Sequence, residues 1–138
     1  MQKAVARWAG HKVKFEIESG SGHKAEADEA PIYGDDDAMR PTEMLLGALG
    51  ACTGINAVLL LQKFKQPMRT LEVRVEGDQM KDWPHAFTEI RIEFVIGWDG
   101  DLDKQLVESA LDMAVNKYCP VDATLTHGTR VKHSRTDT

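Results

Sequence analysis

A run of 18 residues without a charged side chain constrains this sequence more than any other feature. It extends from Met44 to Leu61, and glycine and alanine lie among large apolar residues along it. A helix that has no polar face is normally buried on all sides. The run therefore predicts a central core helix over residues 41–63. Pro41 suits the first helical turn, and Pro67 prevents the helix from continuing.

The run is long enough to span a membrane, but its composition argues against that interpretation. Three glycines, Thr53 and Asn56 dilute its hydrophobicity, and the mean hydropathy of the chain is −0.37. The net charge of −5 gives no reason to expect nucleic acid or an anionic membrane as a partner. The first ten residues contain charges and no apolar segment, and two cysteines do not form a secreted disulfide framework. We therefore expect a cytoplasmic protein that forms one domain over residues 1–138.

Alternating apolar and polar residues predict strands on both sides of the helix. The order of elements indicates an α+β fold in which helices pack on one side of an antiparallel sheet. Such a sheet covers only part of an apolar helix, so the second helix or a second subunit must cover the rest. Before the central helix, we expect strands at 2–8, 11–18 and 23–28, followed by a loop at 29–40. After it, we expect two strands within 71–76 and 90–96, separated by a loop at 77–84. A helix over 102–117, capped by Asp101, and a last strand within 124–134 complete the chain.

The two cysteines, Cys52 and Cys119, are the first candidates for chemistry. Cys52 lies in the middle of the apolar helix, where a neighbouring cation would have to lower its pKa. Cys119 is predicted to follow the second helix, where the helix dipole does not stabilise a thiolate. Free cysteine is also among the most frequently buried residue types, so a structural role is open for both.

Arg40 and Glu43 flank the start of the helix and are the next candidates. Arg40 ends an irregular loop, where functional side chains are common, although a solvated arginine would also fit there. Glu43 would complement the helix dipole whether or not it has another role. The five histidines show no zinc-ligand spacing with either cysteine, and phosphate-loop and hydrolase motifs are absent.

Two segments together resemble a known family. PTEMLLGALGACT at 41–53 and YCPV at 118–121 are similar to the two cysteine motifs of the OsmC/Ohr family of thiol-dependent hydroperoxide reductases. The order of predicted elements agrees over nearly the whole chain. The resemblance implies the OsmC-like α+β fold, in which an antiparallel sheet is wrapped around a long central helix in an intertwined homodimer.

The resemblance also implies an activity and roles for the candidates. Cys52 would attack an organic hydroperoxide, or hydrogen peroxide as a second substrate, and become a sulfenic acid. Cys119 would resolve it as a Cys52–Cys119 disulfide, which an external dithiol would reduce. An arginine would hold the thiolate and a glutamate would position that arginine. The reaction would require no metal or organic cofactor, and its purpose would be oxidative stress defence.

The chain departs from the family pattern at two places. In one branch glutamate directly follows the proline, whereas here Thr42 has that place and Glu43 comes next. The arginine lies near the first hairpin turn in one branch, where this chain has His11 and Lys12, and before the helix in another, where Arg40 is available. We choose Arg40 and Glu43. The shifted acid favours an alternative function as a redox-sensing or small-molecule-binding protein with little turnover.

Overall fold

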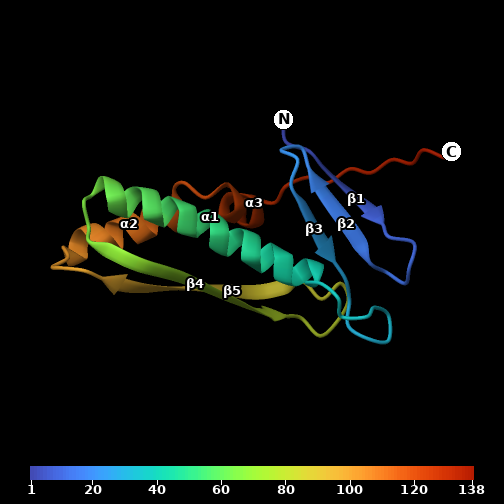
Figure 1. The fold of residues 1–138 in the computed structure, drawn as a ribbon, viewed down its shortest axis with the longest axis horizontal. Coiled ribbons are helices and arrows are strands. Elements are labelled where there is room, and N and C mark those ends of the chain that lie inside the picture. The colour runs from blue at the N-terminus through green and yellow to red at the C-terminus, as the bar shows by residue number, and fades with distance from the viewer. The chain divides into compact units, whose positions relative to one another are not determined.

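The computed structural model describes residues 1–138 as two compact units, Met1–Leu46 and Gly47–Thr138. The first unit contains β1 (Ala4–Trp8), β2 (Phe15–Ser19), β3 (Lys24–Ala27) and the first turns of α1. The second contains the rest of α1 (Pro41–Lys63), β4 (Met68–Gln79), β5 (Phe87–Trp98), α2 (Lys104–Asn116) and α3 (Pro120–His127). All strand pairs are antiparallel, which confirms the predicted α+β class (Figure 1).

The first unit is a three-stranded sheet in the order β1-β2-β3. Trp8 pairs with Phe15, and Ala6 pairs with Ile17, so their side chains share one apolar face. Arg7 and Glu18 form an ion pair on the other face. The predicted alternation is therefore correct, but every residue of β1 is exposed within this chain. The apolar face has no cover in its own unit.

The first hairpin turn is longer than the sequence predicted. The strand expected from His11 begins only at Phe15. Ala9 donates its backbone N–H to the carbonyl of Lys14, and Lys12 has a positive φ of 45°. This wide turn takes up residues whose alternation resembled a strand, and it leaves Val13 exposed.

The loop before α1 is folded around the carboxylate of Asp28, which is 3% exposed. Its Oδ2 accepts the backbone N–H groups of Asp35 at 3.2 Å and Asp37 at 3.1 Å. Hydrogen bonding to the backbone N–H of Glu29, and then of Asp37, lowers the pKa of Asp28 below its ordinary value. Gly34 lies so close to this turn that a Cβ there would collide with the carbonyl oxygen of Glu29.

Helix α1 packs its small residues on β4 in the second unit. A Cβ on Gly50 would lie 3.0 Å from Val75 Cγ2, and one on Gly54 would lie 3.2 Å from Val73 Cγ2. Helices α1 and α2 both lie over one face of the β4–β5 ribbon, as predicted (Figure 1). The buried core beneath them consists of Leu61, Val107 and Ala110, with a surrounding layer of Leu60, Phe64, Met68, Ile96, Trp98, Leu102 and Leu111.

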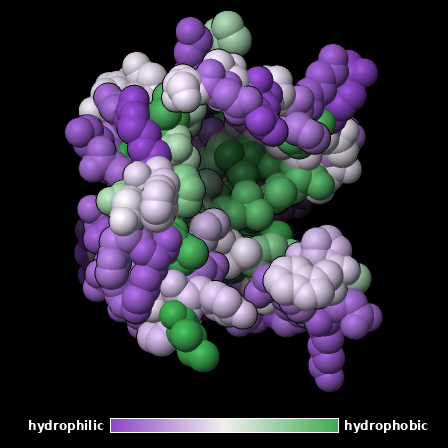
Figure 2. Space-filling view, turned by 90° about the vertical axis from the view of Figure 1, so that its right-hand side faces the viewer, coloured by the Kyte–Doolittle hydropathy of each residue, from purple (hydrophilic) through white to green (hydrophobic).

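Only one face of α1 is buried, in contrast to the expectation of burial on all sides. Ile55 is 62% exposed and Leu59 is 59% exposed on the opposite face. Apolar side chains are visible on the surface of the molecule in Figure 2. α1 also has the length and hydropathy of a membrane span, with 39% of that stretch buried. A core helix of a soluble protein has the same properties, so this likeness is weak support for a span.

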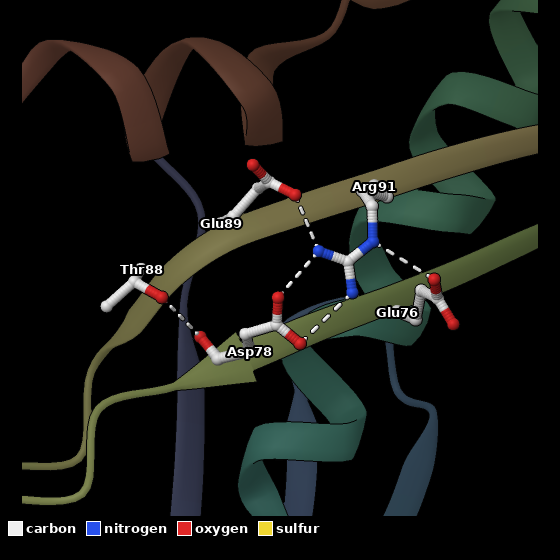
Figure 3. A network of polar contacts seen from close by, with 5 residues as sticks. All are labelled: Glu76, Asp78, Thr88, Glu89 and Arg91. Carbon is white, nitrogen blue, oxygen red and sulfur yellow. Dashed lines mark hydrogen bonds and ion pairs between the residues drawn. The ribbon is translucent and has the colours of Figure 1, made fainter.

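The β4–β5 ribbon carries a network of charges on its outer face. Arg91 on β5 bonds Asp78 through two nitrogens, and it also bonds Glu76 and Glu89 (Figure 3). These carboxylates, Asp78 first, raise the pKa of Arg91. The pairing extends to Gln79 and Phe87, so residues 77–79, which were predicted to be in a loop, belong to β4.

Two predictions for the C-terminal part are wrong. The cap of α2 is Asp103, whose Oδ1 accepts the N–H of Leu106, and not Asp101. A helix, α3, takes the place of the strand expected within 124–134. Pro120 occupies the first turn of α3, where a proline needs no N–H partner, and Gly128 ends the helix with a φ of 68°.

Gly34→Ala should lower the free energy of unfolding by about 2 kcal/mol, because the new methyl group forces the Asp28 loop apart. Gly20→Ala is the matched control, since its Cβ would meet Lys3 at an ordinary 3.4 Å. Urea denaturation of both variants measures the difference. Equal stability of the two variants would contradict the described loop.

Candidate functional site

The structure brings the two cysteines together in the second unit. Cys52 lies midway along α1 and is half-buried, whereas Cys119 is 3% exposed in the link between α2 and α3. The Cys52 thiol lies close enough to Cys119 to act on its titration. Asn56, one turn beyond Cys52, donates its side-chain N–H to the carbonyl of Ala114 at 3.4 Å. This contact ties α1 to α2 beside the thiol pair.

Cys119 is the N-cap residue of α3. Its backbone is extended, with a φ of −90° and a ψ of 106°, and its Sγ accepts the backbone N–H of Asp122 at 3.3 Å. The sequence placed Cys119 only at the end of the preceding helix, where no dipole favours a thiolate. The structure corrects this prediction, because Pro120 begins a new helix. Both the α3 dipole and the N–H of Asp122 favour negative charge on this sulfur.

Burial nevertheless outweighs that local stabilisation. Removal from water raises the pKa of the Cys119 thiol above its ordinary value, and the neighbouring Cys52 thiol raises it further. The backbone N–H of Asp122 acts in the opposite direction. Cys119 is therefore a protonated thiol at neutral pH. Cys52, which is the more accessible of the two, is the sulfur that a dissolved reagent meets first.

Arg40 and Glu43 contact each other in the first unit. Glu43 Oε1 accepts the backbone N–H of Arg40 at 2.9 Å and lies 3.5 Å from its guanidinium. This is the reciprocal half of a capping box, in which the acid of the first turn returns to the residue before the helix. The backbone N–H of Arg40 is the main cause of the lowered pKa of Glu43. Glu43 comes one residue after Thr42, which has the place of the acid in one branch of the family. Glu43 nevertheless contacts Arg40.

Asp36 is a third member of this group that the sequence did not single out. Its Oδ1 lies 3.1 Å from the same guanidinium nitrogen of Arg40. The negative charges of Asp36 and, to a lesser extent, Glu43 raise the pKa of Arg40. The run of three aspartates at 35–37, shortly before Arg40, was the available signal. The sequence predicts only a loop there, because it does not reveal which carboxylate turns back toward the arginine.

The basic residues of the first hairpin turn are also engaged. His11 Nε2 lies 2.8 Å from Asp35 Oδ2, and Lys12 bonds the other oxygen of Asp35. Lys12, and then His11, lower the pKa of Asp35 below its ordinary value. The two positions considered for a functional cation are thus both paired with aspartates of the same loop.

The candidates form two pairs, Cys52 with Cys119 in one unit and Arg40 with Glu43 in the other. Helix α1 begins in the unit of the arginine and carries Cys52 in the unit of the thiols. No three histidine, cysteine or acidic side chains are grouped closely enough to hold a metal ion.

The family model described as "OsmC-like protein" matches residues 34–134, which include both cysteines, Arg40 and Glu43. The chain belongs to the OsmC-like family. It is 34% identical to protein YhfA of Escherichia coli K12 over 132 residues, which cover 96% of this chain and 95% of that one. The resemblance stated from the two motifs is thereby confirmed.

Solved structures agree with this OsmC-like fold. One neighbour is an OsmC-like protein from Mycoplasma pneumoniae, with a TM-score of 0.77 and 18% identity over 93% of this chain and 88% of that one. Another is an organic hydroperoxide resistance protein from Legionella pneumophila, with a TM-score of 0.66 and 16% identity over 91% and 89%. At these identities the neighbours show the fold alone.

In the native, reduced OsmC-like protein, iodoacetamide should modify Cys52 at least about tenfold faster than Cys119. Burial hinders access to Cys119, and its raised pKa lowers its thiolate fraction. Mass spectrometry over a time course measures both rates. The control is the same reaction in urea, where the rates should converge, whereas equal rates in the native protein would contradict the described burial.

Proposed function

We propose that this protein is a thiol-dependent peroxidase that reduces organic hydroperoxides in oxidative stress defence. The observation that carries the proposal is an accessible thiol, Cys52, beside a buried and protonated thiol, Cys119, in a member of the OsmC-like family. A neighbour in the same fold is called an organic hydroperoxide resistance protein. Hydrogen peroxide is a second possible substrate of the same chemistry.

The first step breaks the O–O bond of the peroxide. The Cys52 thiolate attacks the terminal oxygen and is oxidised by two electrons to a sulfenic acid, while the remaining alkoxide takes up a proton and leaves as an alcohol. Cys119 then supplies its sulfur to the sulfenic acid, and its proton leaves with the hydroxyl as water. The product is a Cys52–Cys119 disulfide.

The second step regenerates the thiols. An external dithiol attacks the disulfide, is itself oxidised to a disulfide, and returns both cysteines to the reduced form by exchange. Every electron comes from the dithiol and every oxygen from the peroxide, so the cycle needs no metal or bound organic cofactor. We place the protein in the cytosol, where thiol pools are kept reduced.

Arg40 is our candidate for the cation that holds the Cys52 thiolate, and Glu43 for the residue that positions it. None of the groups that shift the pKa of Cys119 is a cation, so those groups do not include a positive partner for a thiolate. Arg40 is fixed by Glu43 and Asp36 at the entrance to α1. It could serve the thiols of its own chain or those of a second copy.

We further propose that the protein is a homodimer. The open face of α1 combines exposed Ile55 and Leu59 with the small residues Ala48 and Ala51 at helical spacing. Small residues allow two helices to approach closely, and the apolar pair would be removed from water. The uncovered apolar face of the first sheet is a second surface that a partner subunit would cover.

Ile55→Glu should convert a dimer of twice 15.4 kDa into a monomer, because a carboxylate would be buried against the same position of the partner. Gln62→Glu adds the same charge at an exposed site near the end of the helix and should remain dimeric. Light scattering after size-exclusion chromatography gives both masses. A monomeric wild-type protein would remove the dimer proposal.

A redox sensor with little turnover is the second candidate function. It is favoured by Thr42 at the usual position of the acid and by the two carboxylates that share Arg40. Two anions partly offset the charge that the arginine offers to a thiolate. A sensor would form the same disulfide but would not be regenerated repeatedly by dithiols.

One equivalent of cumene hydroperoxide should convert the reduced protein into the Cys52–Cys119 disulfide with loss of two free thiols. Dithiothreitol should restore both thiols and sustain many turnovers. Cys52→Ser should abolish peroxide consumption. Without dithiothreitol, Cys119→Ser should consume one equivalent of peroxide and leave Cys52 as a sulfenic acid, with no disulfide formed. Thiol counting and mass spectrometry measure each outcome.

The results separate the candidate functions. Two unchanged thiols after peroxide treatment would overturn both the peroxidase and the sensor. Formation of the disulfide without repeated turnover would leave the sensor as the function.

A further inference from the structure

The loop before α1 holds Asp36 in an unusual backbone conformation. Its φ is 56°, in the left-handed region that few residues other than glycine adopt, although aspartate enters it more readily than most. Its backbone N–H donates to the carbonyl of Glu29 at 3.0 Å. The N–H groups of its two neighbours, Asp35 and Asp37, both donate to Asp28 Oδ2. A residue that its surroundings fix in a costly conformation is a candidate for a functional role.

Asp28 also fixes the end of the loop that leads into the helix. Its backbone N–H donates to the carbonyl of Met39 at 3.0 Å, and Ala27 forms a single parallel β-bridge with Met39. Met39 directly precedes Arg40 in the chain. One buried residue, Asp28, therefore orders the backbone on both sides of the ion pair between Asp36 and Arg40.

The guanidinium of Arg40 is held through only one of its nitrogens. Nη1 lies 3.1 Å from Asp36 Oδ1 and 3.5 Å from Glu43 Oε1. Nε and Nη2 have no hydrogen-bond partner in the chain, and the side chain is 34% exposed. An exposed ion pair usually contributes little, because ordering two side chains costs entropy. Here the backbone of Asp36 is already ordered, so less entropy is lost when its carboxylate binds Arg40.

We propose that Asp28 and Asp36 are positioning residues of the peroxidase reaction. Asp28 fixes the backbone of Asp36, and Asp36 directs the guanidinium of Arg40 so that its remaining N–H groups are free for the thiolate and the peroxide. The inference rests on the proposed function, in which Arg40 is the cation that holds the Cys52 thiolate. It adds a second carboxylate to Glu43, and this one is placed by the fold of the loop. A charged group accelerates a reaction only when it is held in the productive geometry.

Asp36→Ala should lower the second-order rate constant for oxidation of Cys52 by cumene hydroperoxide by about tenfold, because the guanidinium is no longer directed. Asp36→Asn keeps an oxygen that can accept from Nη1, and its rate should stay within about threefold of the wild type. Asp37→Ala is the matched control and should keep the wild-type rate, since only the backbone of Asp37 takes part in the loop. Quenching a single turnover at successive times and counting free thiols gives each rate.

A double-mutant cycle tests the role of Asp28, because Asp28 is proposed to act through Asp36. Asp28→Asn should lower the same rate constant by about fivefold in the wild-type chain, since the loop loses part of its hydrogen bonding. In the Asp36→Ala background it should change the rate little, because the carboxylate that the loop places is already gone. The Asp36 variants alter only an exposed side chain, so they test the proposal even if Asp28→Asn does not fold.

The outcomes distinguish the positioning role from the peroxidase function. If the wild-type protein does not oxidise Cys52, both are overturned. If the wild type reacts and Asp36→Ala is as fast, or if Asp37→Ala is slowed as much as Asp36→Ala, the positioning role is overturned and the peroxidase stands. Losses of Asp28→Asn and Asp36→Ala that multiply in the double variant would show that Asp28 does not act through Asp36.

Discussion

The close approach of α1 to β4 is the contact on which the second unit depends. Gly50 and Gly54 have no side chains, so the helix backbone can lie directly against Val75 and Val73. That approach brings Leu61 into the core beneath α2 and allows Asn56 to reach the carbonyl of Ala114. The end of α2 is thereby held beside the middle of α1, and Cys119 follows immediately. Larger residues at the two glycines would push the helix outward and separate the two sulfurs.

Charge is arranged differently in the two units. In the first, a loop that is folded around Asp28 directs Asp35 toward His11 and Lys12, and Asp36 toward Arg40. His11, Lys12 and Arg40 are thus all paired with carboxylates of this loop. In the second, Cys119 is removed from water while Cys52 stays partly exposed, and no cation is among the groups that shift the pKa of Cys119. In the first unit, Asp36 and Glu43 both share the guanidinium of Arg40.

Both units leave apolar surface uncovered. The face of the first sheet with Trp8 and Phe15 is open, as is the face of α1 with Ile55 and Leu59. A small chain with few buried side chains gains stability when such faces are removed from water. This physical need is the reason for proposing a second subunit, since the face of the hairpin that was predicted to be buried is exposed within a single chain.

The sequence by itself determined the α+β class, the limits of α1, the antiparallel pairs and the family. These features depend on local periodicity, on prolines at helix ends and on two motifs, all of which are readable within a few residues. The resemblance to the family also singled out Arg40 and Glu43 as candidates, but their contact is known only from the structure. Only the tertiary structure decided that Cys52 and Cys119 meet and that Asp36 joins Arg40. Residues 67 positions apart come together through packing, which no local pattern encodes. The C-terminal helix was missed for a related reason: Pro120 can end one helix or begin another, and only the fold around Cys119 shows that it begins α3.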